Sequence, residues 1–414
     1  MTPPYSLYLH IPFCTHRCAY CDFNTYAGQE DLIPAYVDAL CTEIEFVGTS
    51  FHSLTESPTG VLREGDRGEG IVHTIFFGGG TPSLLSPGQF GSVLQTIRNR
   101  LTLTEDAEIT IEANPGTVSY ENLLELRKTG INRISYGVQS ANTEELRRLE
   151  RAHNFFDVIE AVTSARKAGF DNLNLDLIYG LPEQTPGTWQ TTVKRILDLH
   201  PEHISAYALT LEHGTPFGRW SSKGLLPLPD PDLAAEMYEW ASEVFEANGY
   251  VQYEISNWAK PEHECRHNLQ YWRGLPYLAF GAGAHGYANG YRYSNVLRIK
   301  TYIERLSTDH WSLNTVFPLS PATVNHHKQS LRDDISEFMM TGLRLTQEGV
   351  SEEEFQKRFD QPLREVYGKE IDELLKQGLI EIPSPGIGRG VKGGMIRLTK
   401  RGRLLGNKVF MQFV

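Results

Sequence analysis

Three cysteines near the start of the sequence are spaced for metal binding. A short apolar and aromatic run over residues 5–13 leads into Cys14, Cys18 and Cys21, in the pattern C-x3-C-x2-C. Three thiolates this close cannot pair as disulfides without leaving one over, but they can close around one iron–sulfur cluster, which thiolates usually hold in sets of four. Three ligands leave one iron open, and an open metal position is where metal-assisted chemistry takes place.

A zinc site is the alternative for these cysteines. Structural zinc sites generally have four ligands arranged in two pairs, and the sequence contains no second cysteine pair. The two other cysteines, Cys41 and Cys265, are isolated, and nothing around either of them suggests a fourth ligand. The pattern therefore favours a cluster over zinc.

A second group of side chains that could take part in chemistry is the string His267–Asn268–Leu269–Gln270–Tyr271–Trp272. Imidazole and phenol side chains can bind a metal, and an indole can stack on a flat aromatic ligand. In a helix, His267 and Tyr271 would share one face as an i, i+4 pair. From the residues alone, the favoured interpretation is that His267 caps a helix or packs and that Tyr271 and Trp272 lie in an ordinary core; Cys265 just upstream is a further candidate ligand.

The composition is that of a globular protein of two or three domains. The 414 residues are 40% hydrophobic and 22% charged, and the formal net charge is −12. This acidity disfavours a general binder of nucleic acid or anionic membranes, because each requires a basic face. We find no run long and apolar enough for a spanning helix and no signal peptide in the first residues. Clustered cysteines without an export signal indicate a reducing compartment, so we expect a cytoplasmic protein.

Strand-like and helix-like segments alternate over the first two hundred residues. Strands are predicted at residues 6–11, 71–77, 108–112, 133–138, 172–178 and 203–210. Helices are predicted between them at residues 35–47, 87–100, 120–128, 157–168 and 188–199. Six β-then-α units in series predict a parallel sheet with helices outside it.

Polar or glycine-rich residues follow each predicted strand at once. After the cysteines these stretches are Gly78–Gly79–Gly80–Thr81–Pro82, Glu112–Ala113–Asn114–Pro115, Gly137–Val138–Gln139–Ser140, Asp176 with Tyr179–Gly180–Leu181–Pro182, and Thr210–Leu211–Glu212. Functional groups at the carboxyl ends of successive strands are typical of (β/α) barrels, because those ends meet at one mouth. The sequence therefore predicts an α/β fold with a partial (β/α)6 barrel over residues 1–245.

The remaining segments differ in character. Residues 51–70 are mostly polar and show no hydrophobic periodicity, so they predict a surface loop insertion. Residues 246–324 form an aromatic-rich region and linker that contains the histidine string. Residues 325–414 predict three helices, a glycine-rich hairpin at 386–394 and a strand at 395–398, which together resemble a small winged-helix-like α+β domain.

The last thirty-two residues carry seven Lys or Arg and no Asp or Glu. A basic hairpin on a winged-helix shape raises the possibility of nucleic-acid binding. The overall acidity favours the alternative, which is that these charges are solvated or dock against an acidic surface. We therefore expect no nucleic-acid partner.

The cysteine pattern after a first strand, with a glycine-rich turn after the second, resembles the radical S-adenosylmethionine (SAM) superfamily. In that superfamily three cysteines hold a [4Fe-4S] cluster, and SAM binds the fourth iron through its amino and carboxylate groups. Electron transfer into SAM breaks a C–S bond and yields a 5′-deoxyadenosyl radical. The resemblance implies a cluster on Cys14, Cys18 and Cys21, bound SAM and an electron donor to the cluster.

The resemblance is closer to the group that contains oxygen-independent coproporphyrinogen III oxidase (HemN) and the HemW-type haem chaperones. The shared strings run through the whole predicted barrel in the group's order: Tyr8–Leu9–His10–Ile11–Pro12–Phe13–Cys14, Gly78–Gly79–Gly80–Thr81–Pro82, Ile111–Glu112–Ala113–Asn114–Pro115, Gly137–Val138–Gln139 and Asp176–Leu177–Ile178–Tyr179–Gly180–Leu181–Pro182.

That resemblance also implies a set of SAM contacts. Tyr8 and Tyr20 are expected to flank SAM near the cluster, and Glu112 to hold its polar groups. A glycine turn permits close approach of the backbone. The remaining expected contacts are Gly79, Gly80, Thr81, Gln139, Arg151, Asp176 and Thr210. Each has an ordinary alternative, since a glycine run can be a plain turn, Glu112 a helix cap and Arg151 a solvated surface residue.

Two departures separate this sequence from the oxidase. The oxidase has a further cysteine two residues after the third, where this sequence has Phe23, and an extension before its cysteines, where this sequence has thirteen residues. The string from His267 to Trp272 matches the HNxxYW motif of the HemW-type chaperones.

The resemblance therefore implies a haem chaperone that binds haem and passes it to an acceptor protein. The expected haem contacts are His267, Asn268, Tyr271 and Trp272. The alternative is a radical SAM oxidative decarboxylase that acts on coproporphyrinogen III.

Overall fold

The computed structural model describes residues 3–56, 71–307, 316–383 and 394–414. Contacts divide the chain into two compact units. Unit 1 comprises Met1–Ala241 and Pro276–Lys328, and unit 2 comprises Ser242–Leu275 and Gln329–Val414. The predicted region 246–324 contributes to both units, and the three-part division of the sequence stays a prediction.

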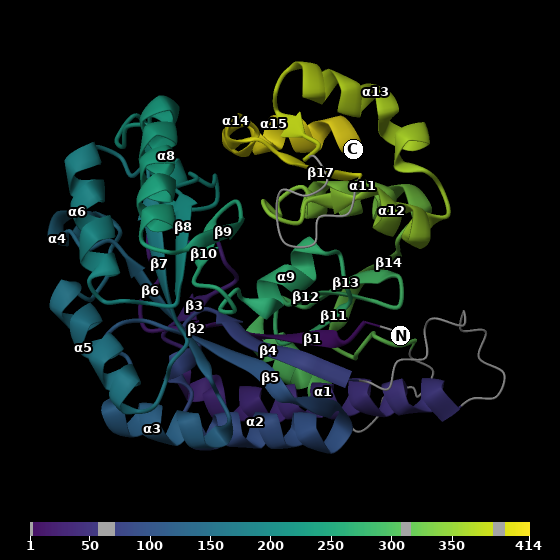
Figure 1. Ribbon diagram of the computed structural model, residues 1–414. Helices are drawn as coiled ribbons and strands as arrows, with labels where there is room; N and C mark the ends of the chain where they lie inside the picture. Colours follow the sequence, from purple (N-terminus) through teal and green to yellow (C-terminus); the bar gives the residue numbers. More distant parts are fainter. Residues whose placement is uncertain (1–2, 57–70, 308–315, 384–393) are drawn as a thin grey trace. The chain divides into compact units, whose positions relative to one another are not determined.

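Unit 1 is built on six parallel strands that are neighbours in chain order (Figure 1). Each predicted strand is present, although the ends shift by a few residues. The strands are β1 (Tyr5–Ile11), β4 (Ile71–Gly79), β5 (Thr102–Ala113), β6 (Arg133–Gln139), β7 (Leu173–Tyr179) and β8 (His203–Ala208).

A helical segment follows each of these strands, so the predicted partial (β/α)6 barrel is confirmed. The helices are α1 (Ile33–Glu56), α2 (Pro87–Arg100), α3 (Tyr120–Thr129), α4 (Thr143–Arg148), α5 (Phe155–Lys167), α6 (Pro186–Leu197), α7 (Pro216–Ser222) and α8 (Pro231–Ala247), which runs on into unit 2. Figure 1 shows α3, α5 and α6 in a row outside the strands. The sequence analysis missed α4, α7 and α8.

The strands have one apolar and one polar face. Leu7, Leu9 and Ile11 of β1 are buried, and Phe77 of β4 packs edge-on against Phe90 of α2 with ring centroids 4.9 Å apart. Side chains alternate between the two faces of a strand, so the residues between these point to the inner face. That face is largely polar: it carries Ser6, Tyr8, His10, Thr74, Glu108, Thr110, Glu112, Arg133, Ser135, Asn174, Asp176, His203 and Ser205.

The sheet continues beyond β1 into strands that the sequence analysis did not predict. Next to β1 lies the parallel strand β11 (Tyr277–Phe280), followed by the antiparallel strands β12 (His285–Ala288), β13 (Tyr291–Asn295) and β14 (Thr323–Lys328). The helix α10 (Ile299–Leu306) lies between the last two in the chain. These strands are short and interrupted by glycines, so their periodicity is too brief to predict them.

A buried carboxylate, Glu43 of α1, ties this extension to the barrel. Its oxygens accept hydrogen bonds from the Tyr302 hydroxyl (2.7 Å), the Asn295 amide (2.7 Å), the Ser320 hydroxyl (2.6 Å) and the Gly281 backbone N–H (2.9 Å). All four groups act as donors. A carboxyl group accepts freely at both oxygens when it is ionised, because the protonated form carries a donor on one of them. Glu43 therefore holds β13 and the loop after β11 against α1.

The predicted surface loop 51–70 is wrong in its first part. α1 continues to Glu56, because Phe51 is buried between Tyr5 and Phe317 with ring centroids 5.5 and 5.0 Å away. The rest of the predicted loop, 57–70, lies outside the described residues.

Unit 2 contains the helices and small sheet of a winged-helix-like domain. Its hydrophobic core includes Phe338, Phe355 and Phe359 together with apolar residues of a three-stranded sheet, whose strand order is β15–β17–β16. Its elements are β9 (Val251–Glu254), β10 (Asn257–Ala259), α9 (Arg266–Trp272), α11 (Leu331–Gly342), β15 (Val350–Ser351), α12 (Glu352–Phe359), α13 (Leu363–Lys376), β16 (Ile380–Glu381), β17 (Met395–Leu398), α14 (Lys400–Leu404) and α15 (Gly406–Phe410).

Basic residues of the C-terminal segment bond within unit 2. Arg397 pairs with Glu381 at 2.7 Å, Arg401 donates to a backbone carbonyl, and Arg403 donates to Gln252 at 2.6 Å. The predicted glycine-rich hairpin 386–394 lies almost wholly outside the described residues. In the part of the chain that is described, no helix is long and apolar enough to span a membrane.

We predict that Glu43→Ala destabilises the chain by about 3 kcal/mol, because it leaves buried donors without their acceptor. Glu43→Gln should cost less, since an amide keeps one acceptor oxygen and the same shape. Calorimetric unfolding of the full chain measures both changes, with the exposed Glu45→Ala on the same helix as control. Equal unfolding of Glu43→Ala and wild type would contradict this role.

Candidate functional site

The cysteine loop and the glycine turn after β4 pack backbone against backbone. Cys14 ends the short strand β2 (Phe13–Cys14), and its Sγ accepts a hydrogen bond from the Thr81 hydroxyl at 3.6 Å. The backbone N–H of Thr81 donates to the Phe13 carbonyl at 2.7 Å. A Cβ on Gly80 would lie 2.5 Å from that carbonyl oxygen, so only glycine permits this approach.

The other two cysteines of the motif lie on the loop between β2 and β3 (Tyr26–Ala27). Cys21 N–H donates to the Cys18 carbonyl at 3.1 Å, which forms a turn, and all three thiols are free. Burial raises the pKa of the Cys14 and Cys21 thiols. Among the described residues, no three His, Cys, Asp or Glu side chains are gathered to hold a single metal ion. By donor chemistry, three thiols on one loop fit iron–sulfur ligation.

Arg151 brings a cation to these thiols. Its Nη1 donates to Cys18 Sγ at 3.7 Å, while Nη2 donates to the Asn114 side-chain oxygen at 2.5 Å and the Gly137 carbonyl at 2.6 Å. A guanidinium stays charged at any working pH, so it can offset thiolate charge. Arg151 is therefore not the solvated surface residue of the alternative interpretation: it is half-buried and joins the cysteine loop to the ends of β5 and β6.

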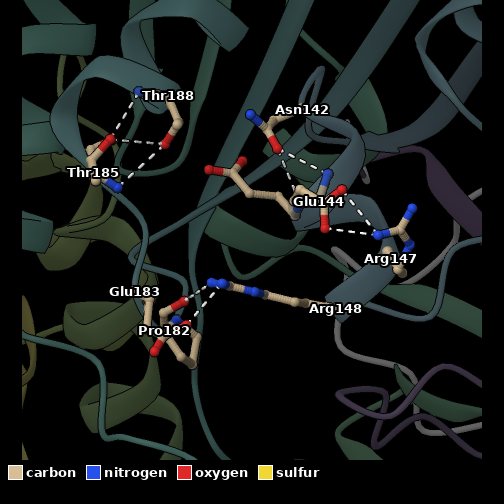
Figure 2. Close-up of polar contacts among 9 residues, drawn as sticks. Asn142, Glu144, Arg147, Arg148, Pro182, Glu183, Thr185 and Thr188 are labelled. Carbon is tan, nitrogen blue, oxygen red and sulfur yellow. Dashed lines mark hydrogen bonds and ion pairs between the residues drawn. The ribbon is translucent and has the colours of Figure 1, made fainter.

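The helix α4, just before Arg151, is anchored at both ends (Figure 2). The Asn142 side chain caps its first backbone N–H groups, as Asn commonly does. Arg148 near its end donates to the Pro182 carbonyl at 3.0 Å and pairs with Glu183 at 2.8 Å. The loops after β6 and β7 are therefore linked, and the link positions Arg151.

His10 fills the space under the glycine turn. Gly79 has φ +114°, and a Cβ there would lie 2.5 Å from the His10 ring. Burial lowers the pKa of His10; the neutral ring bonds the Tyr8 hydroxyl through Nδ1 and the Asn24 carbonyl through Nε2, each at 2.9 Å. His10 and Asn24 were not predicted as site residues, although His10 lies within one of the shared strings.

Glu112 stands at the end of β5 beside the same turn. Its Oε2 accepts the Gly79 backbone N–H at 2.9 Å. Burial, with the charge of Asp176 adding to it, raises the pKa of Glu112 to about 7. A ligand N–H group that donates to this carboxylate would favour its ionised form, so Glu112 can hold an amino group and its charge changes with pH near neutrality.

Asp176 is held in a hydrogen-bonded network on the inner face of β6 to β8. Its oxygens accept from the Ser135 hydroxyl at 2.9 Å and the Asn174 amide at 2.8 Å, and Asn174 also bonds His203 at 2.6 Å. Burial raises the pKa of Asp176 despite these donors. The network fixes the carboxyl group within the polar inner face.

Tyr20 and Gln139 lie close to Arg151. Tyr20 bonds the guanidinium, although burial is the main effect and raises its pKa. A Cβ on Gly137 would lie 3.1 Å from Gln139 Nε2 and 3.0 Å from Arg151 Nη2, which places both side chains at the end of β6. The structure thus gathers most of the predicted SAM contacts at one mouth.

Thr210 is the exception. The predicted strand 203–210 is wrong at its end, because β8 stops at Ala208 and Thr210 is exposed in the following loop. Leu209 and Leu211 on either side pack against a small apolar cluster that includes Phe217, so the side chains beside Thr210 are directed to that cluster. Within the described residues, no hydrogen bond joins Thr210 to the other predicted contacts.

The histidine string forms the helix α9 in unit 2. His267 is only 1% exposed, and its Nε2 bonds the Tyr271 hydroxyl at 2.8 Å. The predicted i, i+4 pairing is therefore present, but the imidazole nitrogen reaches a neighbour on its own helix. Cys265, the alternative ligand, is fully buried, and Asn268 donates to the Tyr253 hydroxyl at 3.4 Å.

The indole of Trp272 is covered on one face. The Arg344 guanidinium carbon lies 4.2 Å from its ring centroid, within cation–π range. Arg344 also pairs with the buried Glu254 at 3.1 Å, and burial raises the pKa of that carboxyl. The pair fixes the guanidinium over the ring, so this face is not open to a porphyrin in the described conformation.

Comparison with known proteins places these features in a family. The family model described as the radical SAM superfamily matches residues 8–196, and the HemN C-terminal domain matches residues 329–405. The protein of Bacillus subtilis named heme chaperone HemW is 37% identical over 410 residues, which cover 99% of each chain. This chain belongs to the HemW family of the radical SAM superfamily.

Further relatives agree with this assignment. The Escherichia coli protein named heme chaperone HemW is 41% identical over 284 residues, covering 69% of this chain and 70% of that one. The solved structure of coproporphyrinogen III oxidase (HemN) from Escherichia coli matches with a TM-score of 0.77 at 25% identity, covering 100% of this chain and 90% of that one.

We predict that SAM affinity falls as the pH drops through about 7. The pKa of Glu112 is raised, so the carboxylate is ionised above that pH and becomes neutral below it, and a neutral carboxyl is a weaker hydrogen-bond acceptor for the SAM amino group. Calorimetric titration from about pH 6 to about pH 8.5 measures the effect. Glu112→Gln should bind more weakly and lose this pH dependence, whereas the exposed Glu125→Gln should keep it. An unchanged profile in Glu112→Gln would remove Glu112 from the SAM site.

Proposed function

We propose that this protein is a haem chaperone, which binds haem and passes it to an acceptor protein. The observation that carries the proposal is the similarity, over nearly the full length, to a protein named heme chaperone HemW. Phe23 supports it, because this residue stands where the oxidase has a further cysteine and is 63% exposed on the cysteine loop. The five free cysteines suit a reducing compartment, and a cytoplasmic location is part of the proposal.

The residues for a [4Fe-4S] cluster are Cys14, Cys18 and Cys21. When bound, the cluster supplies an electron-transfer centre with one iron open to SAM, and an electron donor is required to reduce it. Arg151 offsets charge at Cys18, and Thr81 donates to Cys14. These contacts orient the thiols and stabilise their ionised form.

The residues for SAM surround the same mouth. Glu112 accepts a hydrogen bond from the amino group of SAM, the glycine turn lets the ligand approach the backbone, and Tyr8 and Tyr20 provide aromatic walls. The other proposed contacts are Gly79, Gly80, Thr81, Gln139, Arg151, Asp176 and Thr210, of which Thr210 has the least structural support.

The second candidate is oxidative decarboxylation of coproporphyrinogen III. It is favoured by the fold likeness to the oxidase over the whole chain. Both functions use a cluster and SAM, and they differ in whether the porphyrin is cargo or is changed chemically.

A single preparation distinguishes the two functions. We predict that the full chain, reconstituted anaerobically with its cluster, binds haem with a new Soret band. We also predict that it forms no protoporphyrinogen IX when incubated with SAM, reductant and coproporphyrinogen III. Product formation would contradict a function limited to chaperoning, and failure to bind haem would contradict the chaperone proposal itself.

The motif residues His267, Asn268, Tyr271 and Trp272 remain proposed haem contacts, and the His267–Tyr271 pair must open for the iron to reach the imidazole. Tyr271→Phe removes the hydroxyl that holds Nε2, so we predict about fivefold tighter haem binding, corresponding to one net hydrogen bond. His267→Ala should weaken binding. Soret titration measures both, with Tyr367→Phe as a control, since it removes a hydroxyl of unit 2 that donates to the Phe413 carbonyl. Unchanged binding by His267→Ala would remove this residue from the haem site.

A further inference from the structure

The polar inner face of the barrel continues without a break onto β11, β12, β13 and β14. Strand pairing aligns Ser6 with Tyr277, Tyr277 with Tyr287, Tyr287 with Arg292, and Arg292 with His327. Directly paired residues point to the same side of a sheet. These side chains therefore form one row that leads from the barrel lumen to the edge strand. We call this side of β11–β14 the open face.

The open face belongs to a part of the chain that has no acidic residue. The four strands contain no Asp or Glu, whereas they contain Arg292, Lys328 and three histidines. The whole chain, in contrast, has a net charge of −12. An anionic ligand is therefore attracted to this part of an otherwise acidic protein.

Aromatic rings and a guanidinium form the centre of the row. The Arg292 guanidinium carbon lies 4.3 Å from the Tyr287 ring centroid and 5.8 Å from that of Tyr277, and Nη1 donates to the Tyr277 hydroxyl at 2.9 Å. This stacking fixes the plane of the guanidinium on the sheet. A planar guanidinium matches a carboxylate in geometry and can bind it through two parallel hydrogen bonds.

An exposed histidine lies in the next row of the same face. His285 begins β12 two residues before Tyr287, and its partner across the strands is the small Ser294. The loop just before it is close to the candidate SAM site, since the Ala282 carbonyl accepts from Asn24, whose own carbonyl bonds His10. His285 is exposed, whereas His10 is bonded through both ring nitrogens and His267 is buried.

We propose that the open face receives haem, with His285 as an iron ligand and Arg292 as the partner of a propionate group. The inference rests on the proposed haem chaperone function and adds a site in unit 1 to the motif of unit 2. Haem combines an iron that accepts imidazole, a flat apolar ring and two carboxylates. The open face provides an imidazole for the iron and a guanidinium for a carboxylate, on neighbouring strands in adjacent rows.

The test uses the full chain with its cluster and two probes, haem and iron-free protoporphyrin IX, followed by difference absorption spectra. His285→Ala should weaken haem binding about tenfold, change the Soret band, and leave protoporphyrin IX binding unchanged. Arg292→Gln should weaken binding of both probes, because both carry propionates. His326→Ala is the matched control, since this exposed histidine lies on the opposite side of the same sheet, and it should change neither.

Haem binding and a Soret band that His285→Ala leaves unchanged would overturn this inference and leave the chaperone function standing. Equal weakening of both probes by His285→Ala would also overturn it, because iron ligation cannot account for a loss shared with the iron-free ring. Failure of the wild type to bind haem would overturn the proposed function as well. Thermal unfolding and iron content of each variant show whether the fold and the cluster are retained.

Discussion

The structure of unit 1 depends on the division of its parallel strands into an apolar and a polar face. The apolar side chains pack against the outer helices and provide the burial that stabilises the sheet. The inner face is thereby left to carry serine, threonine, asparagine, carboxylate and arginine side chains, which bond one another across neighbouring strands. Burying such groups is costly unless they are paired, so the network around Asp176 both satisfies them and fixes their positions.

Close backbone contacts with this sheet fix the position of the cysteine loop. Gly80 lets the turn after β4 touch the backbone beside Cys14, while His10 connects the first strand to the end of the cysteine loop through Asn24. The Asn24 side chain then donates to the backbone of the β11–β12 loop at 3.0 Å, which Glu43 anchors to α1. A chain of contacts thus runs from a buried carboxylate on an outer helix to the loop that presents the thiols.

Accessibility separates the two groups of residues that suit haem. In unit 2 the motif histidine is paired with Tyr271, and the tryptophan of the motif lies beneath a guanidinium held by a buried glutamate. In unit 1 the open face carries an exposed imidazole, beside an arginine and tyrosines that are half-buried. The motif histidine must leave Tyr271 before it can bind a metal, whereas the imidazole of His285 is already exposed.

Most of the barrel and its mouth could be predicted from the sequence. The cysteine spacing, the six strand-then-helix units and the strings at the strand ends are local signals, so they identified the superfamily and the candidate residues from Cys14 to Asp176. Arg151 and Thr210 could not be separated by such signals, since each is a single polar residue outside the shared strings. Only the fold showed that the segment after α4 brings Arg151 to the thiols and that Thr210 is exposed beyond the end of β8.

The strands β11–β14 and the burial of His267 were decided by tertiary structure alone. Short strands gain their stability from neighbours distant in sequence, here β1 and the Glu43 cluster, so four or five residues do not predict them. Exposure likewise depends on what packs over a residue, which no spacing encodes. The sequence by itself determined which chemical groups the protein has and to which family it belongs; the tertiary structure decided which of those groups meet and which remain accessible, because burial and pairing arise from contacts between distant parts of the chain.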